Sequence, residues 1–299
     1  MMQEGYTGVL PVMKEKGYTS NDVVAKLRGM LHMKKIGHTG TLDPDATGVL
    51  PVCLGRATKL VGYLTDTDKE YRCVMRLGVT TDTEDMSGKV LTTGDASHID
   101  DAAIADAVRS FVGTYDQIPP MYSAKKINGK KLYELARDGQ VVDRDPVRVY
   151  IREIDDMEIS REEGKVLCSF RVACSKGTYI RSLCRDAGEK LGCGGAMEKL
   201  VRTGAAGIEI EECLTLSEIG SLLKEGGLEE RIRPIDSFYA DCRKLRITGR
   251  DEKAVRNGNK LFLRDTADGR YRVYLQDGTF AAIYDIKDGE AKLCRFFLT

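Results

Sequence analysis

Residues 37–48 read Gly-His-Thr-Gly-Thr-Leu-Asp-Pro-Asp-Ala-Thr-Gly, a composition that suits neither a regular helix nor a regular strand. Glycine is conformationally free, proline interrupts helix hydrogen bonding, and threonine and aspartate favour turns. An amphipathic pattern over 20–31 precedes this segment, and the apolar run 49–54 follows it. We therefore expect an irregular polar loop held between two core elements, where functional side chains are often mounted.

The loop carries His38, Asp43 and Asp45, and more than one interpretation fits them. Asp-Pro commonly opens a turn, and a helix-end histidine often makes only local hydrogen bonds. A phosphate-binding loop is excluded because the segment has neither a lysine nor the Gly-Lys-Ser/Thr pattern. The two carboxylates could also form an acid–base pair, as in glycosidases. The residues alone favour a catalytic or ligand-binding loop, and they leave its chemistry open.

The charge of the chain is segregated although it sums to zero, with 46 basic and 46 acidic residues. Residues 121–152 hold eight Lys/Arg against four acids, a net charge of +4, and 171–185 hold four Lys/Arg and no acid. Acidic residues collect instead over 82–101 and 153–163. Local positive fields of this kind suit a phosphate backbone, although an ordinary solvated surface explains either stretch taken alone.

Nine cysteines occur without a Cys-x-x-Cys pair, and Cys53, Cys73 and Cys174 lie in apolar, strand-like runs. This usage favours free buried thiols in a reducing compartment. The three histidines are isolated from one another in the sequence, so we expect no metal centre. No apolar run approaches membrane-spanning length, and the N-terminus lacks a signal-peptide pattern. We therefore expect a cytoplasmic protein that does not bind membranes.

The spacing of apolar residues predicts most of the regular elements. Strands are expected over 9–12, 71–79, 147–152 and 166–174. Helices are expected over 20–31 with Ser20 as N-cap, 55–64, 100–111 between the N-cap Asp100 and Gly113, 180–191 and 214–223. Residues 121–146 form a basic excursion with one short helix near 132–137. This excursion is too polar for a core and too long for an ordinary connection.

From about residue 243 the pattern changes to short alternating strands separated by Asp-Gly turns. Asp268-Gly269, Asp277-Gly278 and Asp288-Gly289 are hairpin-type signals. Strands over 245–248, 270–275, 279–286 and 291–298 would form a small β-barrel-like module. We expect one domain over 1–240 and a second over 243–299.

Three motifs resemble those of the TruB family, the tRNA pseudouridine-55 synthases. GHTGTLDPDATGVLPVCLGRATK is similar to the family's signature loop, in which the aspartate of Leu-Asp-Pro is catalytic, which implies that role for Asp43. KEYRCVMRLG with RLGVTTDTEDMSG resembles the second motif, whose tyrosine, here Tyr71, stacks on the target base. KGTYIRSL resembles the third. Its arginine pairs with the catalytic aspartate and its tyrosine supports the base pocket, which implies these roles for Arg181 and Tyr179.

Weaker parts of the resemblance suggest further site residues. Leu200, in the segment LVRTG, matches an apolar contact to the uracil, and His38 matches a group that fills the space left by the extruded base. Lys176, beside a predicted helix N-terminus, would suit an anion. The opening motif VLPVMKEKGYTSNDVV also fits, with departures at Glu15 and Asn21 that are expected to adjust local support only.

The resemblance implies an α+β fold. Its catalytic domain would have a mixed, largely antiparallel sheet flanked by helices, an RNA-gripping thumb over 121–146 that orders on RNA, and a C-terminal PUA-like β module. The implied reaction converts the uridine at position 55, in the T-arm loop of tRNA, to pseudouridine. The reaction would begin after the base has flipped out of the RNA. The enzyme would be a monomer and would need no cofactor.

The mechanism and two other functions stay open at this level. Asp43, kept ionised by Arg181, would act as nucleophile at C1′ or as base at the sugar, and Tyr71 is a candidate to assist removal of the C5 proton. One alternative is a non-catalytic RNA-binding or tRNA-folding factor on the same scaffold. The other is an N-glycoside hydrolase that uses Asp43 and Asp45.

Overall fold

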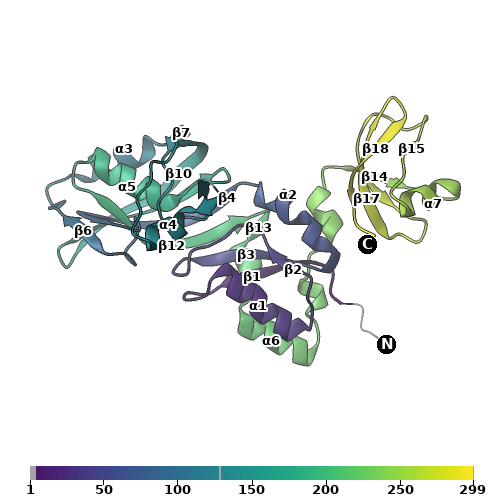
Figure 1. Cartoon of the computed structure of the whole chain (residues 1–299), viewed down its shortest axis with the longest axis horizontal. Coiled ribbons are helices and arrows are strands. Elements are labelled where there is room, and N and C mark those ends of the chain that lie inside the picture. Colours follow the sequence, from purple (N-terminus) through teal and green to yellow (C-terminus); the bar gives the residue numbers. More distant parts are fainter. Residues whose placement is uncertain (1–4, 128, 299) are drawn as a thin grey trace.

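The computed structural model of the chain describes residues 5–127 and 129–298 (Figure 1). The outermost residues of the two expected domains (1–4 and 299) and residue 128 of the expected thumb lie outside that description. A nine-stranded sheet forms the body of the molecule and a five-stranded sheet forms its C-terminal end. The strands of the large sheet are β1 (Gly8–Lys14), β2 (Ile36–His38), β3 (Thr47–Leu54), β4 (Lys69–Leu77), β7 (Gly113–Gln117), β10 (Val147–Glu162), β11 (Lys165–Cys174), β12 (Gly195–Ala205) and β13 (Ile208–Glu209).

The large sheet is mixed and largely antiparallel, which confirms the expected α+β fold. Its central order is β1-β3-β12-β4-β11-β10-β7, with β2 and β13 paired at its side. β12 and β3 pair in parallel, through Val201↔Thr47 and Arg202↔Gly48, and the other strand pairs of this sheet are antiparallel. The parallel contact joins the two halves of the sheet at the point where the polar loop enters β3.

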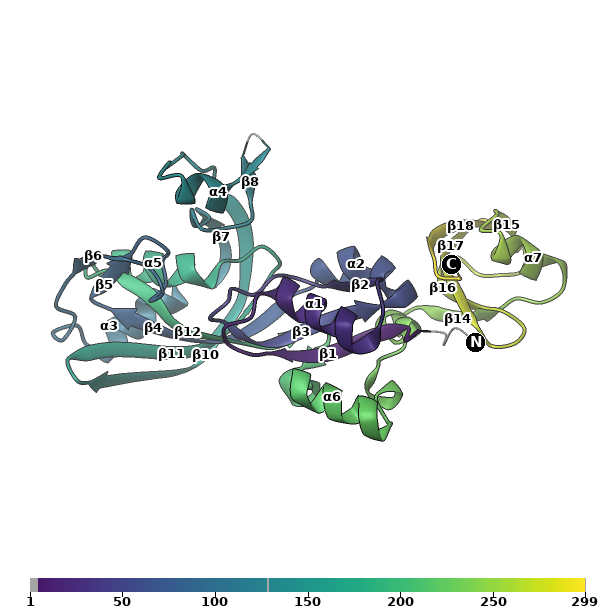
Figure 2. The same ribbon diagram turned by 60° about the horizontal axis from the view of Figure 1, so that its bottom comes forward.

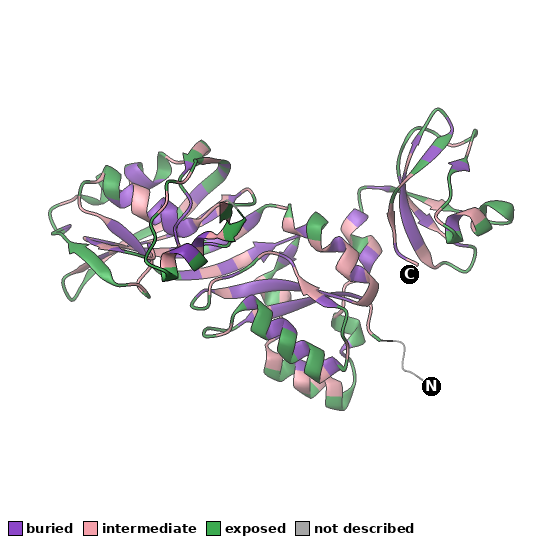
Figure 3. Ribbon diagram, in the orientation of Figure 1, coloured by how far each residue is buried: buried purple, intermediate pink, exposed green. Residues whose placement is uncertain are grey.

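Helices cover the two halves differently (Figures 2 and 3). In the N-terminal half, α1 and α6 share one apolar cluster with β1 and β3, while η1, α2 and η4 lie against the opposite side. In the other half, α3 and α5 pack on β4, β11 and β10. The bounds are α1 (Ser20–Leu31), η1 (Gly55–Leu60), α2 (Val61–Thr65), α3 (Asp101–Arg109), α5 (Ile180–Lys190), η2 (Ile210–Glu212), α6 (Leu216–Glu225), η3 (Glu229–Arg231) and η4 (Ile235–Tyr239).

The structure corrects three boundaries predicted from the sequence. Thr19, and not Ser20, is the N-cap of α1, because Thr19 and Asp22 form a reciprocal capping box. The predicted helix 55–64 starts as a 3-10 turn and becomes α-helical only at Val61. α3 ends at Ser110, so Gly113 opens β7 instead of closing the helix. The predicted N-cap Asp100 is confirmed.

The basic excursion projects from the sheet as a separate lobe (Figure 2). It contains β8 (Lys126–Ile127), β9 (Lys130–Lys131) and the short helix α4 (Leu132–Arg137), which matches the predicted helix. Met121, Leu132 and Leu135 form a small buried cluster of its own. The segment is therefore a folded lobe. Its small core was not predicted, because most residues of the segment are polar. A second small hairpin, β5 (Val79–Thr81) with β6 (Val90–Thr93), follows β4.

The C-terminal sheet has the order β14-β16-β17-β18-β15 and its own apolar core. Asp277-Gly278 and Asp288-Gly289 form the expected hairpins, but Asp268-Gly269 does not, because β16 pairs with β14 in parallel and with β17. The sequence also missed α7 and β15. The elements are β14 (Arg243–Arg246), α7 (Arg250–Arg256), β15 (Leu261–Phe262), β16 (Gly269–Tyr274), β17 (Phe280–Lys287) and β18 (Glu290–Phe296).

The end of the C-terminal sheet rests on the 3-10 turn that follows β3. Arg56 Nη1 donates to the Phe297 carbonyl at 3.2 Å, and Lys59 Nζ donates to the Phe296 carbonyl at 2.9 Å. Phe297 is buried in the same apolar cluster as Tyr239 of η4. These contacts attach the small sheet to the N-terminal half of the large one.

Gly48 offers a test of the junction between the two halves. Its φ is +112°, and a Cβ there would lie 2.1 Å from the Arg202 carbonyl oxygen. We expect Gly48→Ala to lower the free energy of unfolding by about 3 kcal/mol, since backbone strain and a steric clash add. Gly164→Ala is the control, because Gly164 also has positive φ but has no atom within 4 Å of its Cβ position. Urea unfolding measures both, and equal losses would contradict the clash.

Candidate active site

Two buried side chains, those of Ser20 and Lys14, hold the polar loop between β2 and β3 in place. The Ser20 hydroxyl accepts a hydrogen bond from the Leu42 amide at 3.0 Å. Lys14 Nζ, which is fully buried at the end of β1, donates to the Pro44 carbonyl at 3.1 Å and to the Ala46 carbonyl at 2.7 Å. These contacts fix the backbone on both sides of Asp43, so the direction of its carboxylate is set by the fold.

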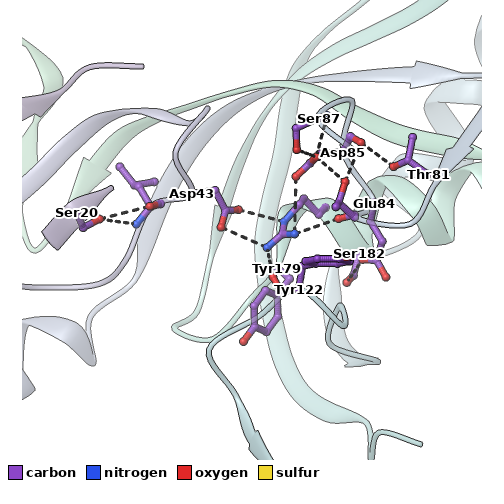
Figure 4. A network of polar contacts seen from close by, with 12 residues as sticks. Ser20, Asp43, Thr81, Glu84, Asp85, Ser87, Tyr122, Tyr179 and Ser182 are labelled. Carbon is purple, nitrogen blue, oxygen red and sulfur yellow. Dashed lines mark hydrogen bonds and ion pairs between the residues drawn. The ribbon is translucent and has the colours of Figure 1, made fainter. Parts of the chain in front are cut away.

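Arg181, in the first turn of α5, faces that carboxylate directly. Figure 4 shows Asp43 and Asp85 in the same network of polar contacts. Arg181 Nε lies 3.0 Å from Asp43 Oδ2, and Nη2 donates to Oδ1 at 3.3 Å. The Arg181 side chain is 6% exposed and that of Asp43 is 40% exposed. The arginine is therefore a buried anchor, and the carboxylate keeps a face open to solvent. The predicted pairing of the two residues is present in the structure.

Two further segments converge on Arg181, and these contacts were not predicted from the sequence. Nη1 donates to the Thr83 carbonyl at 3.0 Å and lies 3.7 Å from Asp85 Oδ2. Nη2 also donates to the Tyr122 carbonyl at 2.9 Å, at the base of the projecting lobe. The Asp85 carboxylate in turn accepts from the Ser87 amide at 3.0 Å, which closes a polar turn. The segment TDTEDMSG carried the signal, because its short polar residues favour such a turn.

The α5 N-terminus that presents Arg181 is itself braced. Gln117 of β7 is fully buried, donates to the Tyr179 carbonyl at 2.9 Å and accepts from the Tyr179 amide at 2.8 Å. Tyr179 is the N-cap residue of α5, two positions before Arg181. The backbone of Tyr179 thus supports the arginine, while a role of its ring in a base pocket stays a prediction.

Burial raises the pKa of the Asp43 carboxyl above its ordinary value of 3.8. The charge of Arg181 opposes this shift and is the largest opposing influence, followed by Lys14, whereas Asp85 and Asp45 add to the rise. Arg181 thus acts on the Asp43 pKa in the expected direction, while desolvation outweighs it and sets the net shift.

Tyr71 and Leu200 lie together beside the loop. Both belong to the apolar cluster that includes Leu42 and Ala46, and Leu200 sits opposite Cys73 on the neighbouring strand. Burial raises the pKa of the Tyr71 phenol, with the charge of Arg202 opposing this rise. The two residues predicted to contact a base therefore border the carboxylate loop from the sheet side.

Three other polar candidates differ in their surroundings. His38 is half-buried at the end of β2, and burial lowers its pKa, which favours the neutral ring. Lys176 is exposed and pairs with Asp66 at 2.9 Å. Asp45 is also exposed and faces Lys16 at 3.7 Å. An acid–base pair of Asp43 and Asp45 gains no support from this outward placement.

Within the described ranges, no cluster of three or more His, Cys, Asp or Glu side chains could hold a metal ion. In the same part of the chain, every helix is too short or too polar to cross a membrane.

Comparison with known proteins shows a likeness to one family over most of the chain. Residues 28–180 match the N-terminal domain of the TruB family pseudouridylate synthases, and 181–239 match the tRNA pseudouridylate synthase B C-terminal domain. The tRNA pseudouridine synthase B of Lachnoclostridium phytofermentans is 48% identical over 93% of this chain and 94% of its own length. The protein of the same name from Halalkalibacterium halodurans is 43% identical over 96% of each.

Solved structures extend the likeness to three dimensions. One of a Cbf5–Nop10–Gar1 complex aligns with a TM-score of 0.70 and 26% identity over 98% of this chain and 85% of that one. Another, of an H/ACA RNP bound to a substrate RNA containing 2′-deoxyuridine, aligns with a TM-score of 0.69 and 25% identity over 98% and 86%.

The mixed sheet, with a carboxylate loop at the junction of its halves, is the catalytic fold of a pseudouridine synthase. Within that class, the matches over most of the sequence are specific. The chain belongs to the TruB family of pseudouridylate synthases.

The carboxylate arrangement predicts an ordered set of titration shifts. Carbon-13 NMR of the Asp43 carboxyl should show a midpoint above 3.8 in the wild-type protein, because burial dominates. Asp85→Asn should move that midpoint to lower pH, since it removes a nearby negative charge. Asp45→Asn should move it less, because Asp45 contributes less to the rise. A wild-type midpoint at or below 3.8, or a larger effect of Asp45→Asn, would contradict this assignment.

Proposed function

We propose that this protein converts the uridine at position 55, in the T-arm loop of tRNA, to pseudouridine. The observation that carries the proposal is the 3.0 Å contact between a half-exposed Asp43 and a buried Arg181. The homologues named tRNA pseudouridine synthase B support both the reaction and the substrate class. A uridine inside a folded loop must be extruded to reach this carboxylate, at a cost of a few kcal/mol.

In the proposed reaction, Asp43 opens the N1–C1′ bond, either as nucleophile at C1′ or as base at the sugar. Both routes need an ionised carboxylate, and Arg181 and Lys14 favour that form against the effect of burial. The uracil then turns between Tyr71 and Leu200 and rejoins C1′ through C5. Tyr71 assists loss of the C5 proton, while His38 occupies the space that the extruded base leaves.

The RNA is proposed to contact the lobe and the C-terminal module. Residues 121–152 carry a net charge of +4, and 243–299 carry 13 basic against eight acidic residues, a net +5. A phosphate backbone responds to such local fields although the whole chain is neutral. We assign 1–240 to the catalytic domain, with 121–146 as an RNA-gripping thumb that orders further on RNA, and 243–299 to a PUA-like module. Lys176 adds a phosphate contact, and the protein acts as a cytoplasmic monomer.

Asp43→Asn tests the proposed chemistry. With excess protein and a T-arm stem-loop carrying [5-³H]uridine, the wild type should release tritium and form pseudouridine at one site. Asp43→Asn should slow the reaction by roughly 10⁴-fold, as expected for loss of a catalytic side chain, and still bind the RNA. Asp45→Asn, which changes the exposed carboxylate of the same loop, should keep near wild-type turnover. Substantial turnover by Asp43→Asn would refute the assignment.

The same reaction mixtures separate the alternatives. An N-glycoside hydrolase would release free uracil, which chromatography of the digest detects. A non-catalytic RNA-folding factor would bind the stem-loop equally well with Asp43 or Asn at position 43 and yield no pseudouridine. Either result would replace the proposed isomerase.

Tyr71→Phe separates stacking from proton transfer. The phenylalanine ring keeps the aromatic surface, so RNA affinity should be unchanged. Loss of the hydroxyl should slow release of the C5 proton by about 10²- to 10⁴-fold, the usual range for a general base. Filter binding and tritium release measure the two effects. Tritium release at the wild-type rate would show that the hydroxyl takes no part.

A further inference from the structure

Arg202 is one of the largest fully buried side chains of the protein, at 1% exposure, and the proposed reaction gives it no role. Arg202 lies on β12 and contacts both ends of the polar loop between β2 and β3, which carries Asp43. Nε donates to the Val49 carbonyl at 2.7 Å, and Nη2 donates to the Gly40 carbonyl at 3.2 Å. Among the described residues, no carboxylate lies within ion-pair distance of it. A buried arginine without a carboxylate is uncommon, because its desolvation is costly.

The guanidinium faces Tyr71. Arg202 and Tyr71 are direct partners across the β12–β4 pair, so their side chains share one face of the sheet. The Arg202 guanidinium opposes the rise that burial causes in the pKa of the Tyr71 phenol. Arg202 therefore lies next to Tyr71 across the sheet while it holds the loop that carries Asp43.

Two lysines add positive charge to the same region. Lys14 is fully buried and donates to loop carbonyls, and Lys69, at the start of β4, donates to the carbonyls of Thr65 and Thr67 at 2.5 Å. Arg202 acts to lower the pKa of each lysine, which shows that the three charges interact. Backbone carbonyls satisfy their hydrogen-bond donors but do not neutralise their charge. For the Tyr71 phenol, Arg202 favours the ionised form, whereas burial and the charge of Asp43 disfavour it and set the net direction of the pKa shift.

We propose that Arg202 is the positioning residue for Tyr71, holding its hydroxyl against the catalytic loop and stabilising its anion when the C5 proton is transferred. The inference rests on the proposed pseudouridine synthesis. In the step concerned, the phenol has lost its proton to solvent and the base has rejoined C1′ through C5. The C5–H bond breaks, its proton passes to the Tyr71 oxygen, and its electron pair restores the ring double bond. Arg202 touches no substrate atom in this scheme.

A deuterium isotope effect distinguishes this role from simple support of the fold. Single-turnover rates are compared for T-arm stem-loops with hydrogen or deuterium at C5 of the target uridine. Arg202→Gln should react about 10²-fold more slowly, as expected when a catalytic group is misplaced. It should bind RNA as well as the wild type and show a clear primary isotope effect, because proton transfer then limits the rate. Arg202→Lys, which keeps the charge, should recover part of the rate.

Arg72→Gln is the matched control. Arg72 follows Tyr71 on β4, but its side chain is exposed and pairs with Asp156 at 2.9 Å. It should keep the wild-type rate and isotope effect. The isotope ratio is measured within one preparation, so a partly unfolded fraction of a variant does not change it. If Arg202→Gln fails to fold, Arg202→Lys is used for the same measurement. A slowed Arg202 variant without an isotope effect, or one as fast as the wild type, would overturn the proposal. Absence of pseudouridine with the wild type would instead refute the proposed function.

Discussion

The ion pair between Asp43 and Arg181 depends on a guanidinium that is buried before any substrate binds. Such a charge is costly to desolvate, and the fold compensates it by bringing distant segments to one side chain. The loop before β3 supplies Asp43, the turn after β5 supplies Asp85 and the Thr83 carbonyl, and the base of the projecting lobe supplies the Tyr122 carbonyl. The geometry of the site therefore depends on the packing of these segments. A change in any of the three segments would alter the direction of Arg181.

The site combines unequal exposure with excess positive charge. Asp43 keeps an open face while its partner is enclosed, so a ligand can reach the carboxylate without displacing the arginine. Burial raises the Asp43 pKa, and Arg181 and Lys14 oppose that rise. Lys14 and Arg202 hold the loop through backbone carbonyls, which fixes its shape without neutralising their charge. The loop is thus rigid and lies in a positive field, which suits chemistry on a polyanion.

Local sequence signals predicted the parts of the fold that depend on local physics. Alternation located β4 and β11, and Asp100 located the start of α3. The Asp43–Arg181 pairing was accessible only through the family resemblance, because 137 intervening residues separate the two. Gln117 and Arg202 gave no signal, since a polar residue in a strand normally points to solvent. Only the folded structure shows that both are buried, with Gln117 bonded to the Tyr179 backbone and Arg202 bonded to backbone carbonyls of Gly40 and Val49. α7 was missed because the three Asp-Gly turns that follow it indicated an all-β module.

The most direct measurement is a crystal structure of the Asp43→Asn protein bound to a T-arm stem-loop. The account predicts that the target uridine is extruded, with C1′ beside the side chain at position 43. Its ring should lie against Tyr71, and Arg181 should keep its contacts to the Thr83 and Tyr122 carbonyls. A uridine still stacked within the RNA loop, or a sugar placed nearer Asp45 than position 43, would contradict it.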